Sequence, residues 1–270
     1  NVFDILGVVG KLLLIILSVF VLDFIISKND LTQRNSYAIL SLALLMALFP
    51  AGLISLDIII ANLFVLFAMR RLITLHSNLN IKKKLFDAAF WISLATLFYF
   101  WAILFLIIVF IAVLYYAQND VKNVLIPFAA VLSLLIILVA YYIITYDEYF
   151  IAEHFDIKMS TDFSIYNSLD RIIAFTIFFT ISVWTFFYYL RLLGERAKKL
   201  KPAYIFIIWW YSIAFVIALI APTKDQSEFI FLFAPLSIIM ANYLEVITER
   251  WFKDGIVYLL VITPIALLLL

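Results

Sequence analysis

The chain has 270 residues, of which 67% are hydrophobic and 14% charged, and its formal net charge is +1. A soluble domain of this size has too little interior to hide so many apolar side chains, so this composition excludes a soluble fold. The small net charge gives no bulk attraction to nucleic acid, and the absence of cysteine excludes disulfides and thiol chemistry. We therefore predict an all-α, polytopic transmembrane bundle that forms a single membrane domain over residues 1–270. Because position 1 is Asn and not Met, we expect a further segment before it.

Apolar runs follow one another along the whole chain. A helix needs about 20 apolar residues to span the hydrocarbon core of a bilayer. Eight runs approach or reach this length: Ile5–Ile26, Tyr37–Leu56, Ile58–Leu75, Val124–Thr145, Ile172–Leu190, Ala203–Ala221, Phe229–Ile247 and Ile256–Leu270. A further run, Leu85–Ala117, has 33 residues and Asp87 as its single charge. This run is too long for one span and short for two.

The charges between the runs predict which connections share a side of the membrane. Arg191–Lys201 carries five basic residues and one acidic residue, whereas Tyr146–Arg171 carries six acidic and two basic residues. Lys and Arg concentrate in cytoplasmic loops, so the first segment is predicted inside and the second outside. This pattern is typical of a protein of the bacterial inner (cytoplasmic) membrane.

Counting spans outward from Ile172–Leu190, the run between these two segments, predicts how Leu85–Ala117 crosses the membrane. Lys82–Lys84 and Gln118–Asn123 both fall on the cytoplasmic side, so Leu85–Ala117 crosses an even number of times. We predict a hairpin of two short helices that turns near Tyr99–Trp101, giving about nine to ten membrane helices in all. The alternative is one long tilted helix, with the three lysines outside.

Three acidic residues at the predicted outer ends of spans are candidates for catalysis. Asp57 begins a span between apolar neighbours, and Asp147 and Glu148 follow the end of another. A carboxylate in such a place can act as general base for an acceptor hydroxyl. The alternative for each residue is an ordinary solvated position in a loop.

Basic residues on the same predicted face are candidates for binding a lipid-linked phosphate. Lys224 lies between two spans and Arg171 begins one, and both cations suit a phosphate. Glu153, His154 and Asp156 have the residue types of metal ligands, but one histidine with no recurring partner does not define a metal site. We expect no metal, and the sequence identifies no cofactor.

Two stretches of the chain resemble known membrane proteins. The first resembles an uncharacterised multi-pass family of flavobacteria and their relatives, and more distantly the middle of the GT-C superfamily of polyprenol-phosphate-sugar-dependent glycosyltransferases. It comprises Ala61–Phe64, Arg70–Arg71, Leu85–Ala89 and Ala95–Tyr99. In that superfamily a span ending in basic residues precedes a pair of short helices at the cytoplasmic leaflet.

The second stretch is similar to a late GT-C span that begins with an Arg-Tyr-type pair and carries a proline. It comprises Gln226–Phe229, Ala234–Leu236 and Tyr243–Glu245. Here Glu228 and Phe229 replace the basic-aromatic pair, which leaves Lys224 as the nearest basic residue for the phosphate. The superfamily also carries a catalytic acid in its first outer loop, a region that would precede Asn1, and Asp57 does not match that motif.

Three hypotheses for function follow. The resemblance implies a glycosyltransferase, or a degenerate relative, that transfers a sugar from a polyprenol-phosphate donor to an acceptor on the outer face. Bulky aromatic spans without a clear catalytic constellation favour instead a non-catalytic subunit of a bacterial envelope complex. A transporter is the third hypothesis, although helices broken by Gly or Pro in paired halves are lacking. Expected partners are membrane lipid, a polyprenol-phosphate-linked sugar and other membrane proteins.

Overall fold

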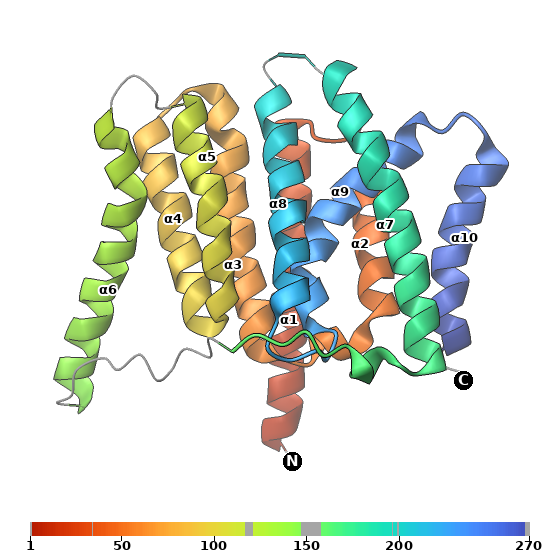
Figure 1. Ribbon diagram of the computed structural model, residues 1–270, viewed down its shortest axis with the longest axis horizontal. Helices are drawn as coiled ribbons and strands as arrows, with labels where there is room; N and C mark the ends of the chain where they lie inside the picture. Colours follow the sequence, from red (N-terminus) through yellow and green to blue (C-terminus); the bar gives the residue numbers. More distant parts are fainter. Residues whose placement is uncertain are drawn as a thin grey trace.

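The computed structural model describes residues 2–33, 35–116, 121–146, 158–195, 197–198 and 200–267. Over these residues the regular secondary structure is helical, with no strand (Figure 1). The described part of the chain forms ten α-helices: α1 (Val2–Asn29), α2 (Tyr37–Leu48), α3 (Leu56–Ile73), α4 (Ile81–Phe98), α5 (Leu106–Tyr116), α6 (Leu125–Tyr146), α7 (Leu169–Glu195), α8 (Lys201–Ile220), α9 (Ile230–Val246) and α10 (Arg250–Leu267).

Six of these helices are long and apolar enough to cross a membrane, namely α1, α3, α6, α7, α8 and α9. Helix α2 and the segment Phe100–Tyr116 are apolar but shorter. Continuous helices are what a bilayer demands, because a backbone inside hydrocarbon must satisfy its own hydrogen bonds. The predicted all-α, polytopic bundle is confirmed.

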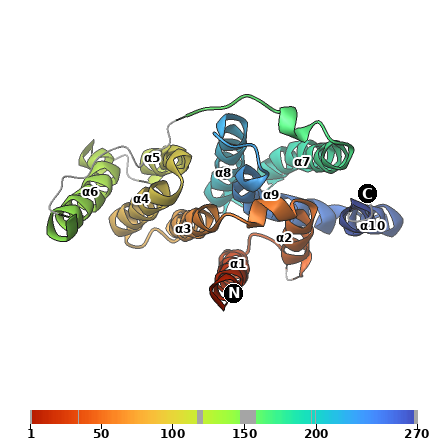
Figure 2. The same ribbon diagram turned by 90° about the horizontal axis from the view of Figure 1, so that it is seen from below.

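Helix α9 is the core of the molecule. Of its most apolar stretch 89% is buried, compared with 11% for α1 and 17% for α6. Helices α2, α7 and α8 pack against α9. Figure 2 shows an elongated arrangement that runs from α6 at one end to α10 at the other, with α1 on one long side. Large side chains fill the centre, where the ring of Phe49 lies 5.1 Å from that of Phe229 and 5.2 Å from that of Phe178.

The predicted hairpin is confirmed. Helix α4 ends at Phe98, the 3₁₀ helix η3 (Phe100–Phe105) reverses the chain, and α5 returns beside α4 (Figure 1). The break falls at Tyr99, whose extended backbone ends α4. The ring of Tyr99 packs 5.4 Å from that of Phe231 in the central helix, so tertiary contacts hold the reversal in place. Helix α4, the first of the hairpin, begins at Ile81, about one turn before the predicted start at Leu85.

The connections divide between the two ends of the bundle. The α1–α2, α3–α4, α7–α8 and α9–α10 connections lie together at the top of Figure 1. We call this end the basic face, because Arg71, Lys84 and Arg191 lie there. Among the described residues, the opposite face carries four 3₁₀ helices: η1 (Pro50–Leu53), η3, η6 (Ser164–Tyr166) and η7 (Ser227–Phe229). The connections therefore group as the charge pattern predicts.

Candidate functional site

Lys224 is fixed at the opposite face by the end of α8. Its Nζ donates hydrogen bonds to the carbonyl oxygens of Ala218, at 2.7 Å, and Leu219, at 2.8 Å. Those carbonyls belong to the last turn of a helix, where no intrahelical donor remains and the helix dipole favours a cation. Nζ also lies 4.8 Å from the ring centre of Phe163. Only 6% of Lys224 is exposed, and this burial lowers the pKa of its ammonium group below the ordinary value.

Tyr166 and Glu228 form a buried hydrogen-bonded pair at the same face. The hydroxyl of Tyr166 donates to Glu228 Oε1 at 2.5 Å and accepts from the backbone N–H of Gln226 at 3.2 Å. Glu228 is 1% exposed, and its Oε2 has no hydrogen-bond partner among the described residues. Burial, together with the hydrogen bond to Glu228, raises the pKa of Tyr166. This pair connects η6 to η7 and so holds the segment before α7 against the segment before α9.

A close backbone approach holds the same region from the other side. Gly52 in η1 lies against Gln226, and a Cβ at position 52 would be 2.6 Å from the Gln226 carbonyl oxygen. Gln226 itself has a φ of 76°, a left-handed conformation that few non-glycine residues adopt. A side chain at position 52 would therefore push apart the α2–α3 and α8–α9 connections.

A cavity opens beside Lys224. It measures about 420 Å³ and is lined by Ser160, Asp162, Ser164, Ile165 and Lys224. Asp162 Oδ1 accepts the backbone N–H of Ser164 at 2.9 Å, an Asx turn. This hydrogen bond holds the pKa of the Asp162 carboxyl below its usual range. The cavity therefore offers one ammonium, one carboxylate and two hydroxyls, groups that suit a ligand with both phosphate and hydroxyl groups.

The predicted site residues fall in different places. Lys224 lines the cavity, and Arg171 lies beside it, where its Nη1 donates to the carbonyl oxygen of Ile165 at 2.5 Å. Asp57 is exposed in the first turn of α3 and is not among the residues that line this cavity. Asp147 and Glu148 lie outside the described residues.

The possible metal ligands give no site in the part of the chain that the structure describes. Within it no three His, Asp or Glu side chains gather as a metal site would require. Glu153, His154 and Asp156 lie outside that part.

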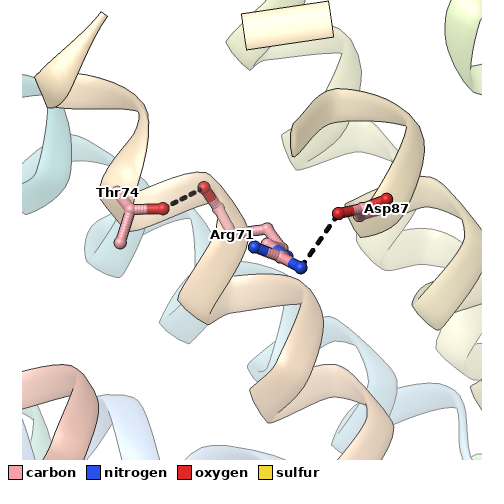
Figure 3. A network of polar contacts seen from close by, with 3 residues as sticks. All are labelled: Arg71, Thr74 and Asp87. Atoms are coloured by element: carbon pink, nitrogen blue, oxygen red, sulfur yellow. Dashed lines mark hydrogen bonds and ion pairs between the residues drawn. The ribbon is translucent and has the colours of Figure 1, made fainter. Parts of the chain in front are cut away.

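Charged residues at the basic face form an ion pair and hydrogen bonds within the protein. Arg71 Nη2 pairs with Asp87 Oδ2 at 3.1 Å, and Thr74 Oγ1 donates to the Arg71 carbonyl oxygen at 2.9 Å (Figure 3). Lys84 Nζ donates to the Thr74 carbonyl oxygen at 2.6 Å and to Ser77 Oγ at 2.8 Å. These contacts join the end of α3 to the start of α4, so this cluster fixes the α3–α4 connection.

Sequence reasoning missed Asp162 and Tyr166. Both lie in a polar connection, where single Asp and Tyr residues are too common to carry a prediction. Asp162 forms an Asx turn, in which an Asp side chain accepts the backbone N–H two residues later whatever that residue is. Nothing local predicts the hydrogen bond between Tyr166 and Glu228, which are 62 positions apart.

The fold defines the class of protein, and a comparison with known families places the chain within it. The helices make it a multi-pass α-helical membrane protein. A family model matches residues 2–269, so the chain belongs to DUF6427, a family of unknown function. No curated protein and no solved structure matches the chain.

Proposed function

We propose that this protein binds a lipid-linked sugar phosphate at its opposite face, on the outer side of the bacterial cytoplasmic membrane, and transfers the sugar to an acceptor. It would thus act as a GT-C-like, polyprenol-phosphate-sugar-dependent glycosyltransferase. The observation that carries the proposal is the position of Lys224. Its ammonium group is hydrogen-bonded to the end of α8 and lines a cavity, and the residue lies between the membrane-spanning helices α8 and α9.

Lys224 suits the phosphate. An ammonium group has three N–H donors, and two of them are used by the carbonyls of Ala218 and Leu219. One donor remains for a ligand, and the two bonds to α8 fix its position before the ligand arrives. Preorganisation of this kind lowers the entropy cost of binding. A polyprenol chain attached to the phosphate would lie in the bilayer beside the helix ends.

Asp162 suits the sugar. An exposed carboxylate repels a phosphate but accepts hydrogen bonds from sugar hydroxyls, and Ser160 and Ser164 can donate or accept beside it. The mixed charges of the cavity therefore match a sugar phosphate better than a free phosphate.

Transfer also needs a base for the acceptor hydroxyl. In the proposed reaction the acceptor oxygen bonds to the anomeric carbon, the bond from that carbon to the phosphate oxygen breaks, and polyprenol phosphate leaves with its electron pair. The hydroxyl proton passes to a carboxylate. Asp57, Asp147 and Glu148 are the proposed candidates for this base, and Arg171 is a second proposed contact for the phosphate.

A transfer assay tests the proposal. Membranes containing the protein are supplied with a polyprenol-phosphate sugar, and transfer to acceptor is measured for the wild type, Lys224→Met and Asp162→Asn. Loss of a hydrogen bond to a charged group predicts at least about a tenfold decrease in transfer for Lys224→Met. Lys158→Met is the matched control, because Lys158 is an exposed lysine of the same face that is not among the residues lining the cavity. Unchanged surface glycans in cells lacking the protein would contradict the proposal.

The shape of the molecule favours a second candidate function, that of a non-catalytic subunit of an envelope complex. The elongated arrangement has two long sides (Figure 2), and large apolar side chains of α7 such as Trp184 and Phe187 are more than half exposed. Purification in mild detergent would then recover partner proteins in fixed ratio. Recovery of a monomer alone would count against a subunit role.

A further inference from the structure

A second recess lies on the outside of α7, away from the Lys224 cavity. This groove measures about 700 Å³. Its wall is a stripe of α7 that runs from Phe179 to Arg191, and Tyr243 of α9 also lines it. Lining residues recur at every turn of the helix, so the groove follows the helix axis. In Figure 2, α7 lies on one long side of the molecule, between α8 and α10.

The groove is apolar along its length and charged at one end. Trp184 and Phe187 are 61% and 63% exposed, so their rings are available to a ligand. Thr180 also lines the groove, but its hydroxyl donates to the carbonyl oxygen of Thr176 at 2.7 Å within the same helix. Arg191 lies at the basic-face end, is exposed, and has no hydrogen-bond or ion-pair partner among the described residues.

Contacts within the protein fix the aromatic wall. Trp184 Nε1 donates to the Tyr243 hydroxyl at 2.6 Å, and the rings of Tyr188 and Tyr243 meet edge to face at 5.0 Å. Tyr243 is only 7% exposed and belongs to the central helix. The wall is therefore anchored to the core and is formed before any ligand binds.

The dimensions match one leaflet of a bilayer. Twelve residue steps from Phe179 to Arg191 give about 18 Å at the helical rise of 1.5 Å per residue. Half of a hydrocarbon core of roughly 30 Å is about 15 Å. An acyl chain of a phospholipid occupies one leaflet, so the groove has about the length that one such chain needs.

We propose that this groove is a specific site for one anionic phospholipid of the basic-face leaflet. One acyl chain lies along the aromatic stripe of α7, and the phosphate meets the guanidinium of Arg191. This site lies at the other end of the membrane from Lys224 and does not depend on the proposed transferase function.

Native mass spectrometry of the detergent-purified protein tests the site. The protein is delipidated and offered phosphatidylglycerol and phosphatidylethanolamine in equal amounts. We expect the wild type to retain phosphatidylglycerol preferentially, by about fivefold, the factor that corresponds to one basic residue near a membrane surface. Arg191→Gln is expected to remove this preference. Arg250→Gln is the matched control, because Arg250 is an exposed arginine at the basic-face end of α10 that does not line the groove.

A second variant tests the acyl-chain part of the site. Val183 lines the groove and is partly exposed, so Val183→Trp fills the groove without disturbing the core. We expect it to lower retention of both lipids. Three results would overturn the proposal: equal retention of the two lipids by the wild type, an unchanged preference in Arg191→Gln, or the same loss in Arg250→Gln. A dimer that retains no lipid and is lost in Val183→Trp would also overturn it, by assigning the groove to a second copy.

Discussion

In the proposed function, Lys224 combines a structural and a binding role in one side chain. Its ammonium group bonds to two carbonyls at the end of α8 and also lines the cavity that contains Asp162. Burial lowers the pKa of Lys224 below its ordinary value of 10.5. A cation held in this way remains useful for an anion only while it is protonated.

The lowered pKa predicts a pH dependence of binding. As pH rises, Lys224 loses its proton at a lower pH than an exposed lysine does, so binding of a lipid phosphate should weaken before the ordinary lysine pKa is reached. Lys224→Arg should keep binding to higher pH, because the guanidinium stays charged. The measurement is thermal stabilisation by polyprenyl monophosphate over roughly pH 7 to 10. Identical pH profiles for the two proteins would show that Lys224 does not provide the charge.

Tyr166 is the residue that links η6 to η7. Tyr166→Phe removes the hydroxyl that donates to Glu228 and leaves that buried carboxyl without its hydrogen bond. An unsatisfied buried group costs about 1–3 kcal/mol, so the free energy of unfolding should fall by about that amount. Thermal unfolding in detergent measures the change, with Tyr258→Phe as control because Tyr258 is 62% exposed. Equal stability of the two variants would contradict this role of Tyr166.

At the scale of the elements, the two glycines Gly52 and Gly194 make a matched pair. A Cβ at Gly52 would meet the Gln226 carbonyl oxygen at 2.6 Å, whereas one at Gly194 would meet nothing within 4 Å. Gly52→Ala should therefore destabilise the protein by about 1–3 kcal/mol, the cost of overpacking. Gly194→Ala in α7 should be neutral or stabilise it by up to about 1 kcal/mol. The same unfolding assay compares them, and a harmless Gly52→Ala would mean that η1 and η7 can separate.

The hairpin shows how far sequence reasoning reaches for an element. Parity of the charged connections predicted that Leu85–Ala117 turns back, because a positive-inside pattern constrains both ends of a run. The same reasoning gave the approximate turn but no cause for it. At the turn, Tyr99 packs against Phe231, a residue far away in the sequence, and no local turn former marks such a contact.

The candidate site could be predicted only in part, and for a physical reason. Lys224 was identified because it is a basic residue at the edge of the spans, where a cation suits a lipid-linked phosphate. Asp162 and Tyr166 were not, because their significance depends on the folding of a polar connection onto η7. Asp57 was selected for its apolar neighbours in sequence, but a residue in the first turn of a helix can still face outward.

At the scale of the whole molecule, the two ends of the helix bundle predict which residues share a side of the membrane. The natural chain lacks cysteine, so single cysteines can be introduced at exposed Ser77 of the basic face and exposed Thr161 of the opposite face. In intact cells an impermeant thiol reagent should label Thr161→Cys at once and Ser77→Cys only after the membrane is opened. Labelling of both from outside would contradict the bundle topology, and labelling of Ser77→Cys alone would reverse the orientation.

Binding of a lipid phosphate by Lys224 is the central claim, and one titration tests it most directly. Purified wild type, Lys224→Met and Lys158→Met are titrated with polyprenyl monophosphate, and bound lipid is counted by native mass spectrometry. The wild type and Lys158→Met should show one site of equal affinity that Lys224→Met weakens at least about tenfold, and any binding in the α7 groove should be the same in all three proteins. Equal affinity of Lys224→Met and the wild type would contradict the claim.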